Sequence, residues 1–157
     1  MILFSTNETL VLNHQKHVMK EKQLLYMNTT ALAFLGDAVF ETYVRDHLIH
    51  TMKGDADRLH RAAVELVKAE AQAYAVKQIL PSLTEEELGL VKRARNKKIS
   101  TKPKNADPVD YKWATAFEAL IGYLYLSGNI DRMKEIIKAA MESVKRSDEK
   151  EEKTGKK

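Results

Sequence analysis

The chain has 157 residues, 44% of them hydrophobic, which is enough for one buried core and too few for two full domains. It contains no cysteine, which excludes disulfides, thiolate zinc sites and cysteine nucleophiles. No segment has the apolar length of a signal peptide core or a membrane span. These features lead us to expect a cytoplasmic, soluble protein with no membrane partner.

The net charge of +4 is concentrated in one stretch, residues 92–104, which we call the basic segment. It holds seven basic residues and no acidic one, and it leaves 19 basic against 22 acidic residues in the rest of the chain. Clustered Lys and Arg side chains neutralise phosphates and release counterions, so the basic segment predicts a polyanion-binding surface. A solvated helix face is the alternative interpretation, and the lack of interleaved acids argues against it.

Apolar residues recur at helical spacing along almost the whole chain, which predicts an all-α fold, a helical bundle formed by a single domain. The periodicity is weak in residues 1–27, which we expect to be an N-terminal arm or a short helix. Asn28 or Thr29 can cap the first well-marked helix, which should run to about Met52, with Gly54 as its stop.

A second long helix is expected from near Asp55 until Pro81, where a helix cannot continue. Thr84 and Glu87 have the spacing of a capping box, so a third helix should begin there and carry the first part of the basic segment. Residues 100–108 have the composition of an exposed loop.

The fourth helix is expected at about 109–126 and the fifth from Asn129 to about Val144. Residues 145–157 are charged and lack apolar groups, so we expect a disordered tail. The domain proper would then be 28–144. The helix at 109–126 also has more apolar surface than one core face needs, which suggests that it provides a dimer interface.

Two carboxylates, Asp37 and Glu118, stand inside otherwise apolar helices, next to Gly36 and near Gly122. A carboxylate among apolar neighbours is costly unless it meets a cation, a donor or a metal ion. Two such groups from neighbouring helices can hold a hard divalent ion, Mg²⁺ first and Mn²⁺ as a substitute. Helical spacing then predicts which residues lie around the metal ligands. They are Thr30, Glu41 and Thr115.

Other roles for these acids, and other kinds of catalytic site, have less support in the sequence. Each acid could instead be paired with Lys or Arg, and Glu41 is well placed for an ion pair with Arg45 four residues on. The histidine pairs lack the HExxH pattern of zinc hydrolases, and neither a GxSxG elbow nor a GxxxxGK[ST] phosphate loop occurs.

The sequences FLGD at 34–37 and FEALIG at 117–122 resemble the two signature helices of the ribonuclease III family. The resemblance covers about residues 28–140. It is nearest to the mini-ribonuclease III subgroup, short bacterial enzymes without a double-stranded RNA-binding domain, in the ALA lead at 31–33, the RARNKK run at 93–98 and the PKN run at 103–105.

The resemblance implies a metal-dependent endoribonuclease that cuts double-stranded RNA and leaves 5′-phosphate and 3′-hydroxyl ends. Asp37 and Glu118 match the family's catalytic, metal-linked acids, whereas Thr30 and Thr115 stand where longer enzymes have two further acids. Fewer direct carboxylate bonds to the metal are therefore expected. The residues expected to contact RNA are Lys92, Arg93, Arg95, Asn96, Lys97, Lys98, Lys102 and Lys104.

The resemblance further implies a homodimer with one cutting site per strand, and precursor 23S ribosomal RNA as the substrate, trimmed at its 5′ and 3′ ends. Whether a ribosomal protein assists stays open. Two other functions remain: an inactive RNA-binding module of a ribosome-associated particle, and a helical DNA-binding or protein-interaction domain with ion-paired acids. Mg²⁺-dependent cleavage would separate the first alternative from the nuclease, and competition between duplex DNA and duplex RNA would separate the second.

Overall fold

A computed structural model describes residues 21–98, 105 and 107–154, with the backbone alone for Glu21 and for 151–154. Within these ranges every regular element is a helix, which confirms the all-α, single-domain prediction. In chain order the elements are α2 (Glu21–Leu25), α3 (Thr29–Thr51), α4 (Ala56–Val67), α5 (Ala69–Ile79), the 3₁₀ turn η1 (Leu80–Ser82), α6 (Glu85–Asn96), α7 (Pro108–Leu126) and α8 (Ile130–Thr154).

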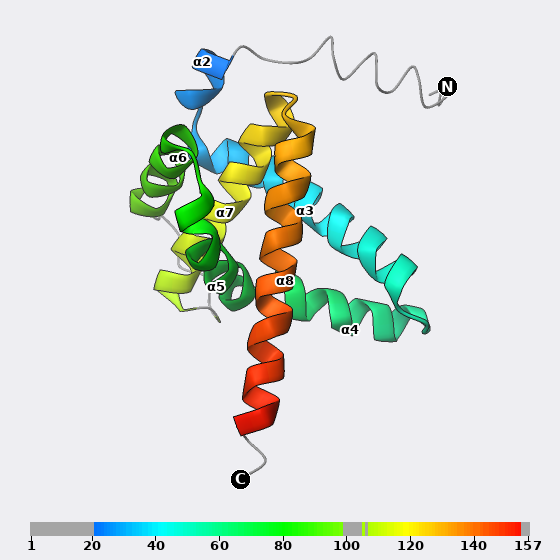
Figure 1. The fold of residues 1–157 in the computed structure, drawn as a ribbon. Helices are drawn as coiled ribbons and strands as arrows, with labels where there is room; N and C mark the ends of the chain where they lie inside the picture. Colours follow the sequence, from blue (N-terminus) through cyan, green and yellow to red (C-terminus); the bar gives the residue numbers. More distant parts are fainter. Residues whose placement is uncertain (1–20, 99–104, 106, 155–157) are drawn as a thin grey trace, which may run out of the picture.

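Helix α7 is the centre of the bundle, and α3, α5, α6 and α8 pack around it (Figure 1). Its apolar residues are buried on almost every side, with Phe117 fully enclosed and in edge-on contact with Phe40 of α3. Most of its apolar surface is used by the core, and Val109 at its start stays exposed, so the expectation that this helix provides a dimer interface stays a prediction. The large apolar side chains left exposed lie mostly on other elements, among them Phe34 and Ile49 on α3.

Helices α3 and α7 meet backbone to backbone. A Cβ atom added to Gly36 would lie 1.7 Å from the carbonyl oxygen of Glu118, and one added to Gly122 would lie 2.0 Å from the carbonyl oxygen of Leu32. No side chain fits at either position, which explains why glycine occurs in the middle of two long helices despite its low helix propensity.

The helix starts agree with the predicted caps. The side chain of Asn28 accepts a hydrogen bond from the backbone of Thr30 at the start of α3. At the start of α6, Thr84 and Glu87 form both hydrogen bonds of a capping box. The cap of α7 was not predicted: it is Asp107, and the helix begins at Pro108, a position where the missing N–H costs nothing.

The predicted second helix is two helices, which corrects the sequence interpretation. The backbone of Lys68 is extended, so α4 ends and α5 begins at this residue although neither proline nor glycine is present. Helix α4 packs against α3, whereas α5 packs against α7 and α8, so the two must point in different directions (Figure 1). The side-chain amide of Gln72 donates a hydrogen bond to the carbonyl of Val67, one of the groups that the break leaves unpaired.

Helix α8 continues to Thr154, ten residues beyond the predicted end at Val144. The prediction of a disordered tail is therefore wrong for 145–154, and 155–157 lie outside the described residues. The packed first half of α8 already supplies the helical nucleus, and Lys, Glu and Arg extend a helix readily. Arg146 also forms an i,i+4 ion pair with Glu142 at 3.7 Å. Of the predicted N-terminal arm, only α2 and the residues that follow it are described.

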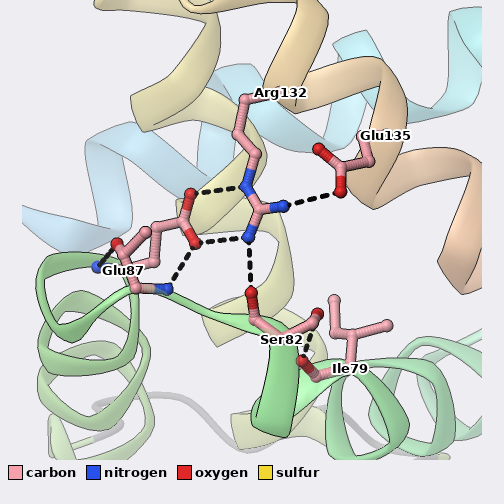
Figure 2. A network of polar contacts seen from close by, with 6 residues as sticks. Ile79, Ser82, Glu87, Arg132 and Glu135 are labelled. Atoms are coloured by element: carbon pink, nitrogen blue, oxygen red, sulfur yellow. Dashed lines mark hydrogen bonds and ion pairs between the residues drawn. The ribbon is translucent and has the colours of Figure 1, made fainter.

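A buried ion pair holds the start of α6 against α8 (Figure 2). Two guanidinium nitrogens of Arg132 each donate to a different oxygen of Glu87 at 2.9 Å, and one of them also donates to the carbonyl of Ser82. The third nitrogen of Arg132 reaches Glu135. Because the Arg132 hydrogen bonds favour the ionised carboxylate, they lower the pKa of Glu87 despite its burial.

None of the helices in the described part of the chain combines the length and hydropathy needed to cross a bilayer.

Candidate active site

Asp37 and Glu118 lie on the same cavity, which has a volume of about 440 Å³. Asp37 comes from the middle of α3 and Glu118 from the middle of α7, one residue after and four residues before the two glycines of the helix crossing. The close approach of the two backbones therefore brings the two carboxylates together. Tyr111, Phe34 and Leu35 form further parts of the cavity wall.

The two carboxylates have no cationic partner among the described residues. Burial, followed by the negative charge of Asp37, raises the pKa of Glu118 to about 8, although a hydrogen bond from Gln72 acts in the opposite direction. Burial and then the charge of Glu41 raise the pKa of Asp37. The alternative that each acid is paired with its own Lys or Arg does not hold within this part of the structure. Two acids whose ionised forms are disfavoured because no positive charge lies beside them are suited to bind a cation, which would favour the ionised forms.

The donor set suits a hard divalent cation with many water ligands. Two carboxylates in an open cavity supply oxygen ligands, and the described part of the chain contains no cluster of three or more His, Cys, Asp or Glu that could enclose a metal. Gln72 does not line the cavity, so its buried amide oxygen, which has no hydrogen-bond partner, is not part of this donor set. Mg²⁺ tolerates few protein ligands because it keeps several waters, so these residues fit it better than a metal that needs a closed protein cage.

The three residues expected around the acids have different surroundings. Thr30 and Thr115 line the same cavity as Asp37 and Glu118. Glu41 does not line it, and its carboxylate forms the expected ion pair with Arg45 at 2.5 Å. Its effect on the cavity is electrostatic, through the raised pKa of Asp37.

The basic segment begins on the last two turns of α6 and adjoins the cavity through one side chain. Lys97 donates hydrogen bonds to Asn28 and, at 2.9 Å, to Thr30, which lines the acid cavity. On its other side Lys97 lines an open groove of about 570 Å³ together with Tyr26, Arg93, Asn96 and the start of α3. A basic groove and the acid cavity are therefore neighbours.

The other basic residues are arranged differently. The guanidinium of Arg95 stacks on the ring of Trp113 at 4.7 Å and bonds Asn96, so part of its binding capacity is already used. Lys92 and Lys98 are exposed. Lys102 and Lys104 lie outside the described residues.

Sequence reasoning missed Gln72 and Tyr111. Gln72 stands in a row of alanines on the buried face of α5, and a lone amide on a small-residue face was the available signal. Tyr111 lies in the first turn of α7, and no sequence feature connected it with the acids.

An all-helical bundle that places two unneutralised acids beside a basic groove is suited to a nuclease. The ribonuclease III domain model matches residues 30–129, and the chain belongs to this family. It is therefore an endoribonuclease of the ribonuclease III type.

Several relatives of similar length are named Mini-ribonuclease 3. That of Brevibacillus brevis is 52% identical over 113 residues, which are 72% of this chain and 84% of the relative. That of Symbiobacterium thermophilum is 44% identical over 115 residues, covering 73% of this chain and 88% of the relative. A protein of Fusobacterium nucleatum with a solved crystal structure has 33% sequence identity and a TM-score of 0.68, covering 74% of this chain and 93% of its own. The subgroup suggested by the sequence motifs is thus confirmed.

Proposed function

We propose that the chain cleaves double-stranded RNA with the help of a divalent cation held by Asp37 and Glu118. The observation that carries this proposal is the cavity that the two acids share, in which neither carboxylate is paired with a cation among the described residues. A charge arrangement that raises the pKa of Glu118 to about 8 is unfavourable for the metal-free protein. It becomes favourable when a cation binds.

When bound, Mg²⁺ would supply Lewis-acid chemistry, lowering the pKa of a water and offsetting charge on the scissile phosphate. Asp37 and Glu118 would provide its protein ligands and fix its position relative to α3 and α7. Thr30 and Thr115 carry hydroxyl groups in place of further charge, so they can orient waters in the cavity. Hydrolysis on this scheme leaves 5′-phosphate and 3′-hydroxyl ends.

The basic groove is the proposed path of the RNA backbone. A-form RNA is recognised mainly through phosphates and 2′-hydroxyls, so a chain that uses its own surface needs cations beside the cutting site. Arg93 and Lys97 supply them in the groove that adjoins the acid cavity. Lys92 on α6 and Lys98, two residues beyond its end, add exposed positive charge, and Lys102 and Lys104 are proposed as RNA contacts from the sequence alone.

The biological substrate we propose is precursor 23S ribosomal RNA, cut in the base-paired stem that joins its 5′ and 3′ ends. This step rests on the resemblance to the mini-ribonuclease III subgroup. Such a substrate would place the activity in the cytoplasm, and it leaves open whether a ribosomal protein helps to present the RNA.

We further propose a homodimer that uses α3. Phe34 is 85% exposed, lies three residues before Asp37 and lines the acid cavity, so a second copy covering it would bring two cutting sites close together. A large exposed aromatic side chain on a rigid helix is typical of an interface anchor. Phe34→Glu should shift the protein from dimer to monomer in sedimentation analysis, with Val109→Glu, at another exposed apolar position, as the matched control.

Cleavage of a labelled RNA duplex with Mg²⁺, compared with EDTA, tests the nuclease proposal. We expect cutting only with Mg²⁺, with partial activity in Mn²⁺. Cutting in EDTA would exclude a metal-dependent reaction. Tight duplex binding without any cutting would favour the alternative, an inactive RNA-binding module, for which the small number of acids in the cavity is the supporting observation.

A further inference from the structure

Gln72 joins the acid cavity to the break between α4 and α5. Its side chain is buried, with 3% exposure, on a face of α5 formed otherwise by small and apolar residues. The amide nitrogen Nε2 donates to the carbonyl of Val67 at 2.7 Å and to Oε1 of Glu118 at 3.2 Å. The second bond connects residues 46 positions apart in the chain, so it exists only because the fold brings α5 against α7.

The orientation of this amide is fixed by its neighbours. Both partners of Nε2 are acceptors, a backbone carbonyl and a carboxylate. Turning the amide by 180° would place its oxygen against the Val67 carbonyl oxygen and, when Glu118 is ionised as a metal ligand must be, against a carboxylate oxygen, so both hydrogen bonds would be lost. In the present orientation the amide oxygen is buried without a hydrogen-bond partner. The two hydrogen bonds from Nε2 offset the free energy lost at this unpaired oxygen.

We propose that Gln72 is a positioning residue, which holds the Glu118 carboxylate in the orientation that binds the divalent cation. This inference rests on the proposed function. The break at Lys68 sets where α5 starts, and the Val67 carbonyl fixes one N–H of the amide, so the other N–H has a defined direction toward Glu118. Hydrogen bonds of this kind orient metal ligands and typically change metal affinity by about 10- to 100-fold when removed.

A neutral hydrogen-bond donor at position 72 can orient the Glu118 carboxylate without neutralising its charge. A lysine or arginine here would also bond Glu118, but its charge would neutralise the carboxylate and compete with the cation. An apolar side chain would leave the carboxylate free to rotate and the Val67 carbonyl without its donor. The amide alone restricts the carboxylate and leaves the negative charge of the cavity in place.

The test uses Gln72→Met, which keeps the length of the side chain and removes the donor. A matched control is Gln78→Met, the same change at an exposed position of the same helix. Two quantities are measured for the full-length chain: the rise in melting temperature that Mg²⁺ produces, and cleavage of duplex RNA as a function of Mg²⁺ concentration. Binding of Mg²⁺ to the folded state raises the melting temperature, so the first readout is independent of activity.

For Gln72→Met we expect the Mg²⁺ concentration at half-effect to rise at least about tenfold in both measurements. The KM for RNA should stay unchanged, because Gln72 is buried away from the basic groove. Gln78→Met should match the unaltered chain. Equal Mg²⁺ dependence for both variants would overturn the inference.

Gln72→Lys keeps the inference testable if Gln72→Met does not fold. The lysine can donate to both Val67 and Glu118, so the melting temperature in EDTA should be maintained or raised. The Mg²⁺-induced rise should disappear, because the ammonium group occupies the place of the cation. A Gln72→Lys protein that still responds to Mg²⁺ like the unaltered chain would show that position 72 does not control Glu118.

Glu118→Gln separates this inference from the proposed function. If that variant still cuts RNA and responds to Mg²⁺, the metal site itself is wrong. If it loses both while Gln72→Met behaves like its control, the metal site stands and the role of Gln72 fails.

Discussion

Glu87 and Glu118 are two glutamates in the same bundle, the first buried and the second partly exposed on the acid cavity, and their surroundings are opposite. Glu87 meets Arg132, which donates two hydrogen bonds at 2.9 Å and lowers the pKa of Glu87 (Figure 2). Glu118 meets another acid, Asp37, and a neutral amide, and its pKa rises to about 8. The first arrangement stabilises the folded chain, whereas the second disfavours the ionised form of Glu118, a cost that a bound cation can relieve.

The contrast separates a structural acid, Glu87, from a candidate catalytic acid, Glu118. Both residues are carboxylates on helices, and both form hydrogen bonds with a residue about 45 positions away. The difference lies in whether the partner carries a positive charge. A largely buried carboxylate left without a cation is therefore the feature that marks the candidate active site.

The largest expected effect is on catalysis. Asp37→Asn and Glu118→Gln should each lower cleavage at least about a thousandfold, since a lost metal ligand removes several kcal/mol of transition-state stabilisation. Neither should reduce the melting temperature in EDTA, because each removes charge repulsion and not an ion pair. Single-turnover cleavage and thermal melting measure the two quantities. If either variant cuts RNA at the normal rate, the assignment of that acid to the active site is wrong.

The second expected effect is on stability. Glu87→Ala should lower the free energy of unfolding by about 3–5 kcal/mol, because it leaves the shielded Arg132 guanidinium without its main partner. Denaturant unfolding measures this loss, with Glu135→Ala as a control, since Glu135 is an exposed partner of the same arginine. The Mg²⁺ dependence of cleavage should not change. A change in Mg²⁺ affinity would mean that the Glu87–Arg132 pair influences the acid cavity, so the two glutamates would not have separate roles.

The third expected effect is on the pH dependence of stability in EDTA, where the two acids should act in opposite directions. The pKa of Glu118 is about 8 in the folded chain against 4.5 ordinarily. Its contribution to stability is therefore full below pH 4.5 and is lost as the pH rises toward 8. The pKa of Glu87 is lowered, so its contribution is present above 4.5 and is lost as the pH falls through the lowered value.

Melting curves of Glu118→Gln and Glu87→Gln against the unaltered chain check these signs. Relative to that chain, Glu118→Gln should gain stability as the pH rises from about 5 to 8. The stability of Glu87→Gln should fall furthest below that of the unaltered chain near neutral pH, and this difference should shrink as the pH falls. Parallel pH profiles for all three proteins would contradict the pKa directions.

The smallest expected effect is on RNA binding. Lys97 bonds Thr30 at the edge of the acid cavity but forms no ion pair with Asp37 or Glu118 among the contacts described. Lys97→Ala should weaken duplex binding a few-fold and reduce the slope of log affinity against log salt by about 1. Filter binding over a salt series measures both. A gain in Mg²⁺ affinity in this variant would instead mean that Lys97 partly neutralises the acids.

The parts of the fold that depend on neighbouring residues could be predicted from the sequence. Caps at Asn28 and Thr84, the stop at Pro81 and the apolar spacing of α3 and α7 all act within one or two helical turns. The same holds for Asp37 and Glu118, because a single acid inside an apolar helix is visible in a short window of sequence.

The parts that depend on tertiary contacts could not be predicted. The break at Lys68 reflects the different packing of α4 and α5 and has no local breaker. The partner of Glu87 lies 45 residues away, and Gln72 reaches Glu118 across 46. The continuation of α8 past Val144 was missed because composition was weighed without the helix that precedes it.

The glycine crossing of α3 and α7 sets the distance between these two helices at the active site. Main-chain atoms, which cannot change rotamer, touch at Gly36 and Gly122 and limit how near the two helices can come. The opening between Asp37 and Glu118 should thus tolerate wide variation in the surrounding core, so that repacked or recombined versions of this bundle keep a usable gap. An alanine at either glycine would push α3 and α7 apart and widen the opening between Asp37 and Glu118.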